Sequence, residues 1–373
     1  MSTDPIEQMM RKGVRDLVFP GGVLLAACRG EIVHHQAYGL ANLYTGTPLT
    51  TDTCFDLASL TKPLATTLAV MKLIEAGRLG LDHPLEAVLP ESARTDKGKI
   101  RIDQLLAHNA GLPDYRPFYE SCENIPAGSR KSFLRKRILK EPLRAPIGQT
   151  VLYSDLGFML LEWVIERASG SRLDRFTFQR VYAPLALDRL FFVDLEGPSP
   201  KGPFAATEYC FWRNRVLEGW VHDENAFISG GIQGHAGLFG TAEAVFQLLC
   251  EIMNIYHRSF DSDPGKARLF RGDLVRRFLE PYADTGRSLG FDRPSRQGSS
   301  CGTLFSDNTV GHLGFTGTSF WMDLDRSVVV VLLTNRIHPS RDNLKIRGFR
   351  PALHDAVMGE LGERRKIKPG GIR

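Results

Sequence analysis

The sequence predicts an α+β fold in which one sheet is built from both ends of the chain and helices occupy the middle. Paired strand patterns at residues 23–38 and 315–334, with helical periodicity between them, support this prediction. The 373 residues suffice for two domains. We therefore expect a discontinuous sheet domain of residues 1–80 and 285–373 and a helical insertion of residues 81–284.

The first strand pattern is a hairpin near the N-terminus. An apolar run extends from Val23 to Cys28, and the pair Arg29-Gly30 then favours a tight turn. A second strand is expected from Glu31 to Tyr38.

The second strand pattern lies near the C-terminus. Residues 315–322 and 327–334 are rich in β-branched and aromatic side chains, and the polar segment 323–326 joins them. The segment from His312 to Thr318, with glycines three positions apart, is expected to open this hairpin. Glycine at the start of a strand favours close approach of another molecule to the backbone.

Helical periodicity dominates the middle of the chain. Apolar residues three to four positions apart predict helices that begin near Leu60, at Leu156, at Ala242 and at Arg350. The first two have C-terminal glycines at positions 77 and 170, as helix ends commonly do.

Composition indicates an ordinary globular protein. Hydrophobic residues make up 43% of the chain, charged residues 24%, and the net charge is +5. The largest basic cluster, residues 130–137, is interpreted as the solvent-facing side of a helix. No apolar run reaches the roughly 18 residues of a membrane span. We therefore expect neither nucleic acid nor a membrane as a partner, and the sequence carries no signal for a particular oligomeric state.

Six cysteines are scattered along the chain without a C-x-x-C pair. This usage favours free thiols in a reducing compartment, so we expect a cytoplasmic protein. The segment Leu25-Ala26-Ala27-Cys28 resembles a lipoprotein cleavage site. Because the same residues form a good strand, we interpret this likeness as a decoy.

Three short motifs could carry chemistry. In Ser59-Leu60-Thr61-Lys62, a helix start would place the serine and the lysine on one face, where a neutral lysine amine can accept the serine proton. The alternative is a helix cap at Ser59 beside a solvated lysine. Tyr153-Ser154-Asp155 offers either a phenol as proton carrier or a cap for the next helix. His312-Leu313-Gly314 offers a histidine at a sheet edge.

In this order the motifs resemble those of the serine β-lactamase and penicillin-binding-protein superfamily, in particular its class C β-lactamase and esterase branch. That superfamily uses S-x-x-K, then Y-x-N or a variant, then K-T-G or H-x-G. The resemblance extends from about Phe19 to Pro339 and includes 105–112 and 237–242. It implies a β-lactamase/transpeptidase-like fold, a mainly antiparallel sheet with terminal helices and an inserted helical domain, with the active site in the cleft between them.

The resemblance also implies roles for individual residues. Ser59 would be the acylated nucleophile, Lys62 its base and Tyr153 a proton relay. The backbone amides of Ser59 and Phe315 would form the oxyanion hole. His312 would complete the catalytic group, no cofactor would be needed, and the implied substrate-binding residues are Asp155, Gly314, Thr316, His222 and Asp223.

Two departures from the family pattern favour hydrolysis of a small ester, amide or peptide. Asp155 stands where many relatives have asparagine, and His312-Leu313 replaces Lys-Thr. Leu313 cannot form a side-chain hydrogen bond, and histidine is largely neutral at pH 7. The alternatives are a β-lactamase or D,D-carboxypeptidase and a non-catalytic binding protein of the same fold.

Two further motifs offer alternative functional sites. Gly286-Arg287-Ser288-Leu289-Gly290 fits the nucleophile elbow of α/β-hydrolases, but it lacks a buried strand before it and a helix after it. The cluster His222-Asp223-Glu224 could be a polar loop, a wall of the substrate pocket or a metal site. The nearby Glu208, Trp212 and Trp220 could add walls to such a pocket, and their pattern indicates only that this region packs over another surface.

Overall fold

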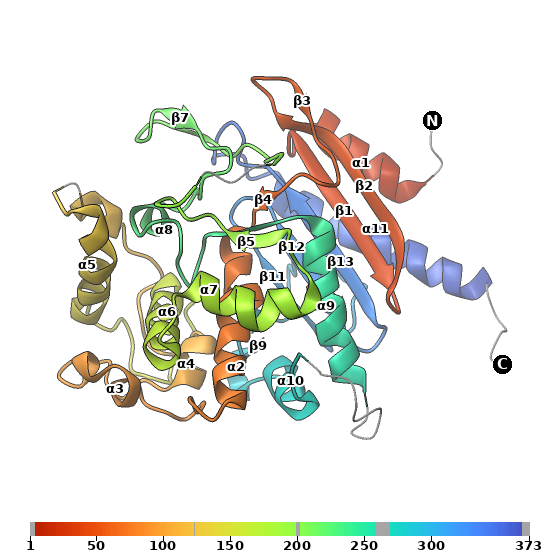
Figure 1. Cartoon of the computed structure of the whole chain (residues 1–373). Coiled ribbons are helices and arrows are strands. Elements are labelled where there is room, and N and C mark those ends of the chain that lie inside the picture. Colours follow the sequence, from red (N-terminus) through yellow and green to blue (C-terminus); the bar gives the residue numbers. More distant parts are fainter. Residues whose placement is uncertain (1–3, 123, 199–201, 259–268, 368–373) are drawn as a thin grey trace.

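The computed structural model of the chain describes residues 4–122, 124–198, 202–258 and 269–367 (Figure 1). Within these residues the main sheet has eight strands, each antiparallel to its neighbours. In spatial order they are β3 (Thr47–Pro48), β2 (Glu31–Asn42), β1 (Gly21–Cys28), β13 (Val328–Thr334), β12 (Ser319–Asp323), β11 (Thr309–Leu313), β10 (Phe291–Asp292) and β9 (Arg287–Ser288). Both ends of the chain thus contribute to one sheet, which confirms the predicted α+β fold.

The inner strand β1 is buried on both faces because apolar residues occupy all its central positions. Leu24 and Ala26 belong to the apolar cluster beneath the terminal helices, whereas Val23 and Leu25 belong to the larger core on the opposite face. This alternation follows from the two-residue period of a strand. The segment that resembles a cleavage site therefore belongs to an inner strand of the sheet.

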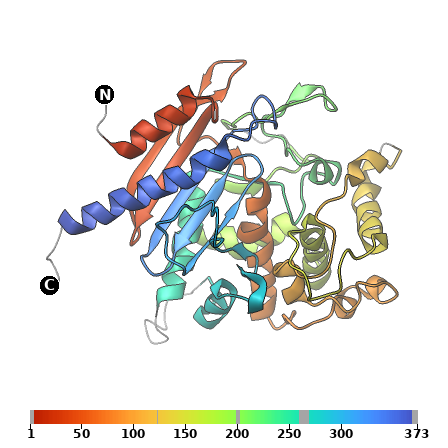
Figure 2. The same ribbon diagram turned by 180° about the vertical axis from the view of Figure 1, so that it is seen from behind.

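The two terminal helices cover one face of the sheet, as Figure 2 shows. They are α1 (Pro5–Arg15) and α11 (Ile346–Ile367), which contact each other. On the other face, α9 (Ala242–His257) packs against β1 and β13. Thus one helix of the predicted insertion lies directly on the sheet, and the boundaries at 81–284 remain a prediction.

The remaining elements lie mostly beside this sandwich. Near the large core they are α2 (Leu68–Glu75), α6 (Asp155–Ser169), α7 (Leu173–Thr177) and α10 (Gly272–Leu279). The helices α3 (Leu85–Val88), α4 (Ile102–Leu106), α5 (Ala127–Lys140) and α8 (Glu224–Ile228) also contribute buried residues to this core. Single turns of other helix types are η1 (Ala58–Leu60), η2 (Lys62–Thr67), η3 (Pro90–Ser92), η4 (Phe118–Ser121), η5 (Phe178–Tyr182), η6 (Ala183–Leu185) and η7 (Ala283–Thr285).

Short strands in the middle of the chain were not predicted. In the described part of the chain, β4 (Phe55–Asp56), β8 (Leu238–Gly240) and β5 (Leu190–Phe192) form a three-stranded sheet. A second pair, β6 (Tyr209–Cys210) and β7 (Arg215–Val216), forms a hairpin. Two or three residues are too few to show a periodic pattern in the sequence.

The C-terminal hairpin differs from its prediction in two ways. The strand expected at 315–322 begins at Ser319, because residues 314–318 form a turn in which Gly317 has a φ of +108°. His312 therefore lies in the preceding strand β11, which the sequence did not indicate. Gly311 interrupts the apolar pattern of that strand, yet a Cβ there would overlap the ring of Trp321.

The basic helix α5 is not simply a solvent-facing surface. Lys131 and Arg135 both form ion pairs with Glu162 and Glu166 of α6. Glu162 is completely buried, and burial raises its pKa to about 7. The interpretation of these two basic residues as solvated was therefore wrong. Among the described residues no helix is long and apolar enough to cross a membrane.

The placement of β1 predicts the effect of removing it. A chain that begins at Cys28 lacks the strand that joins β2 to β13 and exposes the apolar faces packed on it, so we expect no cooperative unfolding transition. Thermal unfolding followed by circular dichroism measures this. The control chain begins at Asp4, whose side chain caps α1, and should unfold cooperatively. Cooperative unfolding of the shorter chain would contradict an inner position for β1.

Candidate active site

Ser59 lies on the turn η1, directly after a strained residue. Ala58 has a φ of +47°, which costs a non-glycine residue about 1–2 kcal/mol. The Asp56 carboxylate accepts a hydrogen bond from the Ala58 N–H at 2.8 Å, and the Thr61 hydroxyl donates to the Ala58 carbonyl at 2.6 Å. The surrounding groups thus hold the turn in a conformation that it would not adopt alone.

Asp56 connects this turn to two other segments. Its second carboxylate oxygen accepts from the His222 N–H at 2.7 Å, and its backbone carbonyl accepts from the Thr316 hydroxyl at 2.7 Å. Burial raises the pKa of Asp56. Sequence reasoning missed this residue because a single aspartate beside a two-residue strand forms no motif. Thr316 is buried with its hydroxyl on this carbonyl, so it supports the turn and does not line the site.

Lys62 places its ammonium group at the centre of the site. The Nζ lies 3.0 Å from Ser59 Oγ, 2.6 Å from Asp155 Oδ1 and 3.3 Å from the His235 carbonyl oxygen. The side chain is fully buried. Burial lowers the pKa of Lys62, but the Asp155 carboxylate and Tyr153 outweigh this effect and hold the pKa above its usual value. The resting site therefore contains a lysine ammonium paired with a carboxylate.

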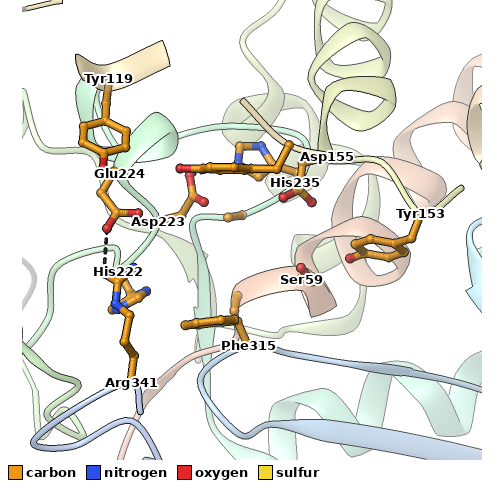
Figure 3. A pocket seen from close by; sticks show the side chains of 13 residues that line it. Ser59, Tyr119, Tyr153, Asp155, His222, Asp223, Glu224, His235, Phe315 and Arg341 are labelled. Carbon is orange, nitrogen blue, oxygen red and sulfur yellow. Dashed lines mark hydrogen bonds and ion pairs between the residues drawn. The ribbon is translucent and has the colours of Figure 1, made fainter. Parts of the chain in front are cut away.

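Tyr153 stands beside the serine and the lysine. Its ring centre is 4.7 Å from Lys62 Nζ, and its hydroxyl points toward Ser59 (Figure 3) and interacts with both residues. Burial raises the pKa of Tyr153 although Lys62 opposes this shift. The side chain of Ser154 caps α6 by accepting from the Gly157 N–H, which fixes the chain at this point.

His108 positions Tyr153 from behind. The two ring centres are 4.6 Å apart, and His108 Nδ1 accepts a hydrogen bond from the Ser154 N–H at 3.0 Å. Burial lowers the pKa of His108 well below its usual value, so the ring stays neutral and able to accept. His108 lies in the segment 105–112 that resembled the family, but no pattern in that segment distinguished it from its neighbours.

His312 is neutral and almost completely buried. Burial lowers the pKa of His312 to about 4, and its Nδ1 donates to the Leu313 carbonyl oxygen at 2.8 Å. No partner for its Nε2 is found among the described residues. The ring lies 5.9 Å from that of Tyr153. After it, a Cβ on Gly314 would overlap the Thr318 hydroxyl, so only glycine fits this turn.

Two cavities meet at Ser59. The first, about 420 Å³, is lined by Ala58, Ser59, Tyr115, Tyr119, Tyr153, Asp155, His222, Asp223, Glu224, His235, Ala236, Phe315 and Arg341 (Figure 3). The second, about 370 Å³, is lined by Ser59, Tyr153, Asp292, His312, Leu313, Gly314, Phe315, Arg336, Leu344, Ile346, Arg347 and Arg350. Ser59, Tyr153 and Phe315 belong to both. The predicted site residues other than Lys62 and Thr316 therefore line one cavity or both, and the buried Lys62 lies behind the cavity wall beside Ser59.

Phe315 borders both cavities and is held by its backbone. Its carbonyl oxygen accepts from Arg336 Nε at 3.0 Å and from Nη2 at 2.6 Å, and its side chain is 48% exposed. Within the described residues, the backbone N–H groups of Phe315 and Ser59 have no hydrogen-bond acceptor. Two unpaired donors are thus available beside the serine.

The cluster at residues 222–224 is a cavity wall. Asp223 caps α8, and its carboxylate lies 2.9 Å from His235 Nε2. Burial raises the pKa of Asp223, but the interaction with His235 outweighs burial and holds this pKa far below its usual range. Glu224 pairs with Arg341 at 2.6 Å, the dashed contact in Figure 3, and Arg341 also binds Glu208. No metal-binding group of acidic, histidine or cysteine residues exists in the described part of the chain.

Ser288 is not a nucleophile elbow. It lies on the edge strand β9, is completely buried, and donates its hydroxyl hydrogen to the Leu279 carbonyl oxygen at 2.8 Å. An elbow serine would be exposed at the end of an inner strand. The competing α/β-hydrolase interpretation is therefore wrong.

Two relatives with assigned names match this chain over most of its length. A protein named N-acetylmuramyl-L-alanine amidase from Bacillus subtilis is 33% identical, and the match covers 89% of this chain and 80% of that protein. A putative D-alanyl-D-alanine carboxypeptidase from Escherichia coli K12 is also 33% identical, with 87% and 80% covered.

Solved structures show the same fold. The hydrolase EstCE1, described as having promiscuous acyltransferase activity, has a TM-score of 0.71 at 23% identity over 95% of this chain and 97% of its own. An octameric penicillin-binding protein homologue from Pyrococcus abyssi has a TM-score of 0.72 at 19% identity, with 98% and 78% covered. The family model described as Beta-lactamase matches residues 6–350. The chain therefore belongs to the beta-lactamase family and is a serine hydrolase.

Proposed function

We propose that the protein cleaves a small ester or amide through an acyl-enzyme on Ser59. The observation that carries this proposal is the 3.0 Å contact between Ser59 Oγ and Lys62 Nζ at the junction of the two cavities. A substrate that spans both cavities would place its scissile bond beside the serine. A nucleophile within hydrogen-bond reach of a base is the geometry that covalent catalysis requires.

In acylation, Ser59 Oγ attacks the carbonyl carbon and its proton passes to Lys62. Lys62 accepts this proton only as a free amine. The active form of the enzyme is therefore the one in which Lys62 has lost the proton that the Asp155 carboxylate stabilises in the resting site. The two unpaired N–H groups, of Ser59 and Phe315, suit the negative oxygen of the tetrahedral intermediate. Collapse of the intermediate releases an alcohol or amine, which takes a proton through the Tyr153 hydroxyl.

Deacylation reverses these roles. Water attacks the acyl carbon and passes a proton, directly or through the Tyr153 hydroxyl, to the Lys62 amine, which then returns a proton to Ser59 Oγ as the serine leaves. Every step uses side chains and water, so no cofactor enters the proposal. His312 is neutral above about pH 4, so its role would be to pack beside Tyr153 and present an uncharged Nε2 to the second cavity.

The second cavity favours an amide whose leaving group carries a carboxylate. Arg336, Arg347 and Arg350 line it, and none of them has a carboxylate partner among the described residues. Arg350 is 5% exposed and its Nε has no hydrogen-bond partner there. The relatives named as amidase and carboxypeptidase cleave amides next to an amino acid, so an amino acid or short peptide amide is the second candidate. A β-lactam is less suited, because neutral His312 and apolar Leu313 replace a lysine and a threonine.

We also propose that the reaction takes place in the cytoplasm. All six cysteines are free thiols, as a reducing compartment would maintain them, and Cys28 ends an inner strand of the sheet.

A fluorophosphonate probe tests the nucleophile. We expect one adduct on the wild type, none on Ser59→Ala, and one on Ser288→Ala, because Ser59 contacts Lys62 whereas the buried Ser288 hydroxyl donates to a backbone carbonyl oxygen. Intact mass spectrometry measures the adduct. An adduct that persists in Ser59→Ala and disappears in Ser288→Ala would show that Ser288, and not Ser59, is the nucleophile.

Kinetics of single variants test the proton carriers. Lys62→Ala and Tyr153→Phe should each lower kcat/KM for a reactive ester by at least about 100-fold, the usual magnitude for general acid and base groups. The matched control Lys99→Ala removes an exposed lysine outside both cavities and should change little. Near-normal turnover by Lys62→Ala would eliminate it as the base.

The pH profile tests the influence of Asp155. The rate should rise with pH as Lys62 loses its proton, and Asp155 moves this rise to higher pH by stabilising the ammonium form. Asp155→Asn should therefore shift the acidic limb of kcat/KM to lower pH by about 1–3 units. Asp114→Asn makes the same change at an exposed position nearby and should not move it. An unchanged limb in Asp155→Asn would show that Lys62 does not govern it.

A further inference from the structure

Arg336 follows strand β13 and lies against the turn that carries Phe315. Its Nε and Nη2 both donate to the Phe315 carbonyl oxygen, at 3.0 Å and 2.6 Å, and its guanidinium carbon lies 4.8 Å from the centre of the Phe315 ring. We infer that Arg336 is a positioning residue, which fixes the Phe315 N–H group where it can donate to the negative oxygen of the tetrahedral intermediate. This inference rests on the proposed function and adds a residue that acts through Phe315.

Two peptide groups meet at Phe315, and different contacts fix them. The preceding peptide contains the Phe315 N–H and the Gly314 carbonyl oxygen, which accepts from the Gly317 N–H at 3.1 Å within the turn. The following peptide contains the Phe315 carbonyl oxygen, which accepts from Arg336. Since the side chain of Phe315 is half exposed, packing constrains it only in part. Loss of Arg336 would therefore let Phe315 change its φ and ψ and redirect its N–H.

The guanidinium group is anchored at its other end as well. Its Nη1 donates to the carbonyl oxygens of Arg341 and Asn343, at 2.9 Å and 2.7 Å. Together with the two bonds to Phe315, these bonds use four of the five N–H groups that an arginine has. The aliphatic part of Arg336 packs against Gly317, where a Cβ would overlap its Cγ. The group that holds Phe315 therefore has a fixed position of its own.

Arg336 carries its charge into a nearly buried position. The residue is 6% exposed, and burial together with Arg347 and Arg341 lowers the pKa of Arg336 to about 10, so it remains charged at neutral pH. A buried charge is costly unless polar groups compensate it, and three backbone carbonyl oxygens do so here. A lysine has a single nitrogen in place of the planar fork and cannot reproduce this arrangement. The position thus requires an arginine.

The expected effect of Arg336 lies in the rate and not in substrate binding. A donor of an oxyanion hole acts when it is about 2.7–3.1 Å from the developing negative oxygen, and removal of one donor costs about 10²–10³ in rate. A displaced donor loses part of this effect. Acylation and deacylation both pass through a tetrahedral intermediate, so both steps slow when the Phe315 N–H moves. A contact made in the transition state alone lowers kcat and kcat/KM together and leaves KM nearly unchanged.

The test compares Arg336→Met with the wild type on a neutral, reactive ester such as p-nitrophenyl butyrate. The methionine side chain keeps a stem against Gly317 but removes every donor. We expect kcat to fall by about 10–100-fold while KM changes by less than about twofold. The inhibition constant of phenylboronic acid, whose tetrahedral adduct with Ser59 resembles the intermediate, should rise by about the same factor as kcat falls. Arg336→Lys, which restores one donor, should lose only about three- to tenfold in kcat.

Arg276 of α10 supplies the matched control. It is also partly buried, and its Nη1 donates to two backbone carbonyl oxygens, those of Tyr256 at 3.1 Å and Arg258 at 3.4 Å, but it lines neither cavity. Arg276→Met should therefore leave kcat and the inhibition constant close to their wild-type values, whatever it does to thermal stability. Thermal unfolding of each variant, followed by circular dichroism, measures stability separately.

The outcomes separate this inference from the proposed function. A wild type that neither cleaves esters nor binds phenylboronic acid would overturn the proposed function. If the wild type does both, the positioning role is overturned when Arg336→Lys equals the wild type, or when Arg336→Met folds and keeps its kcat. A rise in KM confined to esters that carry a carboxylate would also overturn it and make Arg336 a substrate ligand. If Arg336→Met does not fold, Arg336→Lys decides between these results.

Discussion

The buried ammonium group of Lys62 is the point on which the site depends. A lone charge at a fully buried position would be unstable, so the fold surrounds it with Asp155, the Ser59 hydroxyl and the His235 carbonyl oxygen. These partners come from α6, from η1 and from the segment before β8. The requirement to pair one charge therefore brings together three segments that are distant in the sequence.

Asp56 plays the corresponding role for the backbone. By accepting hydrogen bonds from Ala58 and His222, it fixes the strained turn before the serine and the first residue of the cavity wall. The Thr316 hydroxyl on its carbonyl adds the turn that carries Phe315. The nucleophile, the second amide donor and the cavity wall thus share one buried anchor, which limits how far they can move independently.

The parts of the fold that local patterns encode were predictable. The strands near Val23 and Val328 and the helix that ends at Gly170 follow from apolar periodicity and glycine ends. The motif spacing also placed Ser59 and Lys62 together. The contacts of Asp56 with His222 and of His108 with Tyr153 were not predictable, because each joins segments that are tens to hundreds of residues apart. Strand β11 was missed because Gly311, required there by the Trp321 ring, removes the side-chain pattern by which a strand is recognised.

The order of strands also has a consequence for synthesis. In the finished sheet β1 pairs with β13, so that Leu24 faces Leu332. At the usual rate of protein synthesis, roughly 15 to 60 seconds pass between the synthesis of β1 and that of its partner β13. During this time β1 can pair only with β2, and its other edge remains open to unrelated chains. The nascent protein therefore has a long interval of aggregation risk, which shielding by chaperones would reduce.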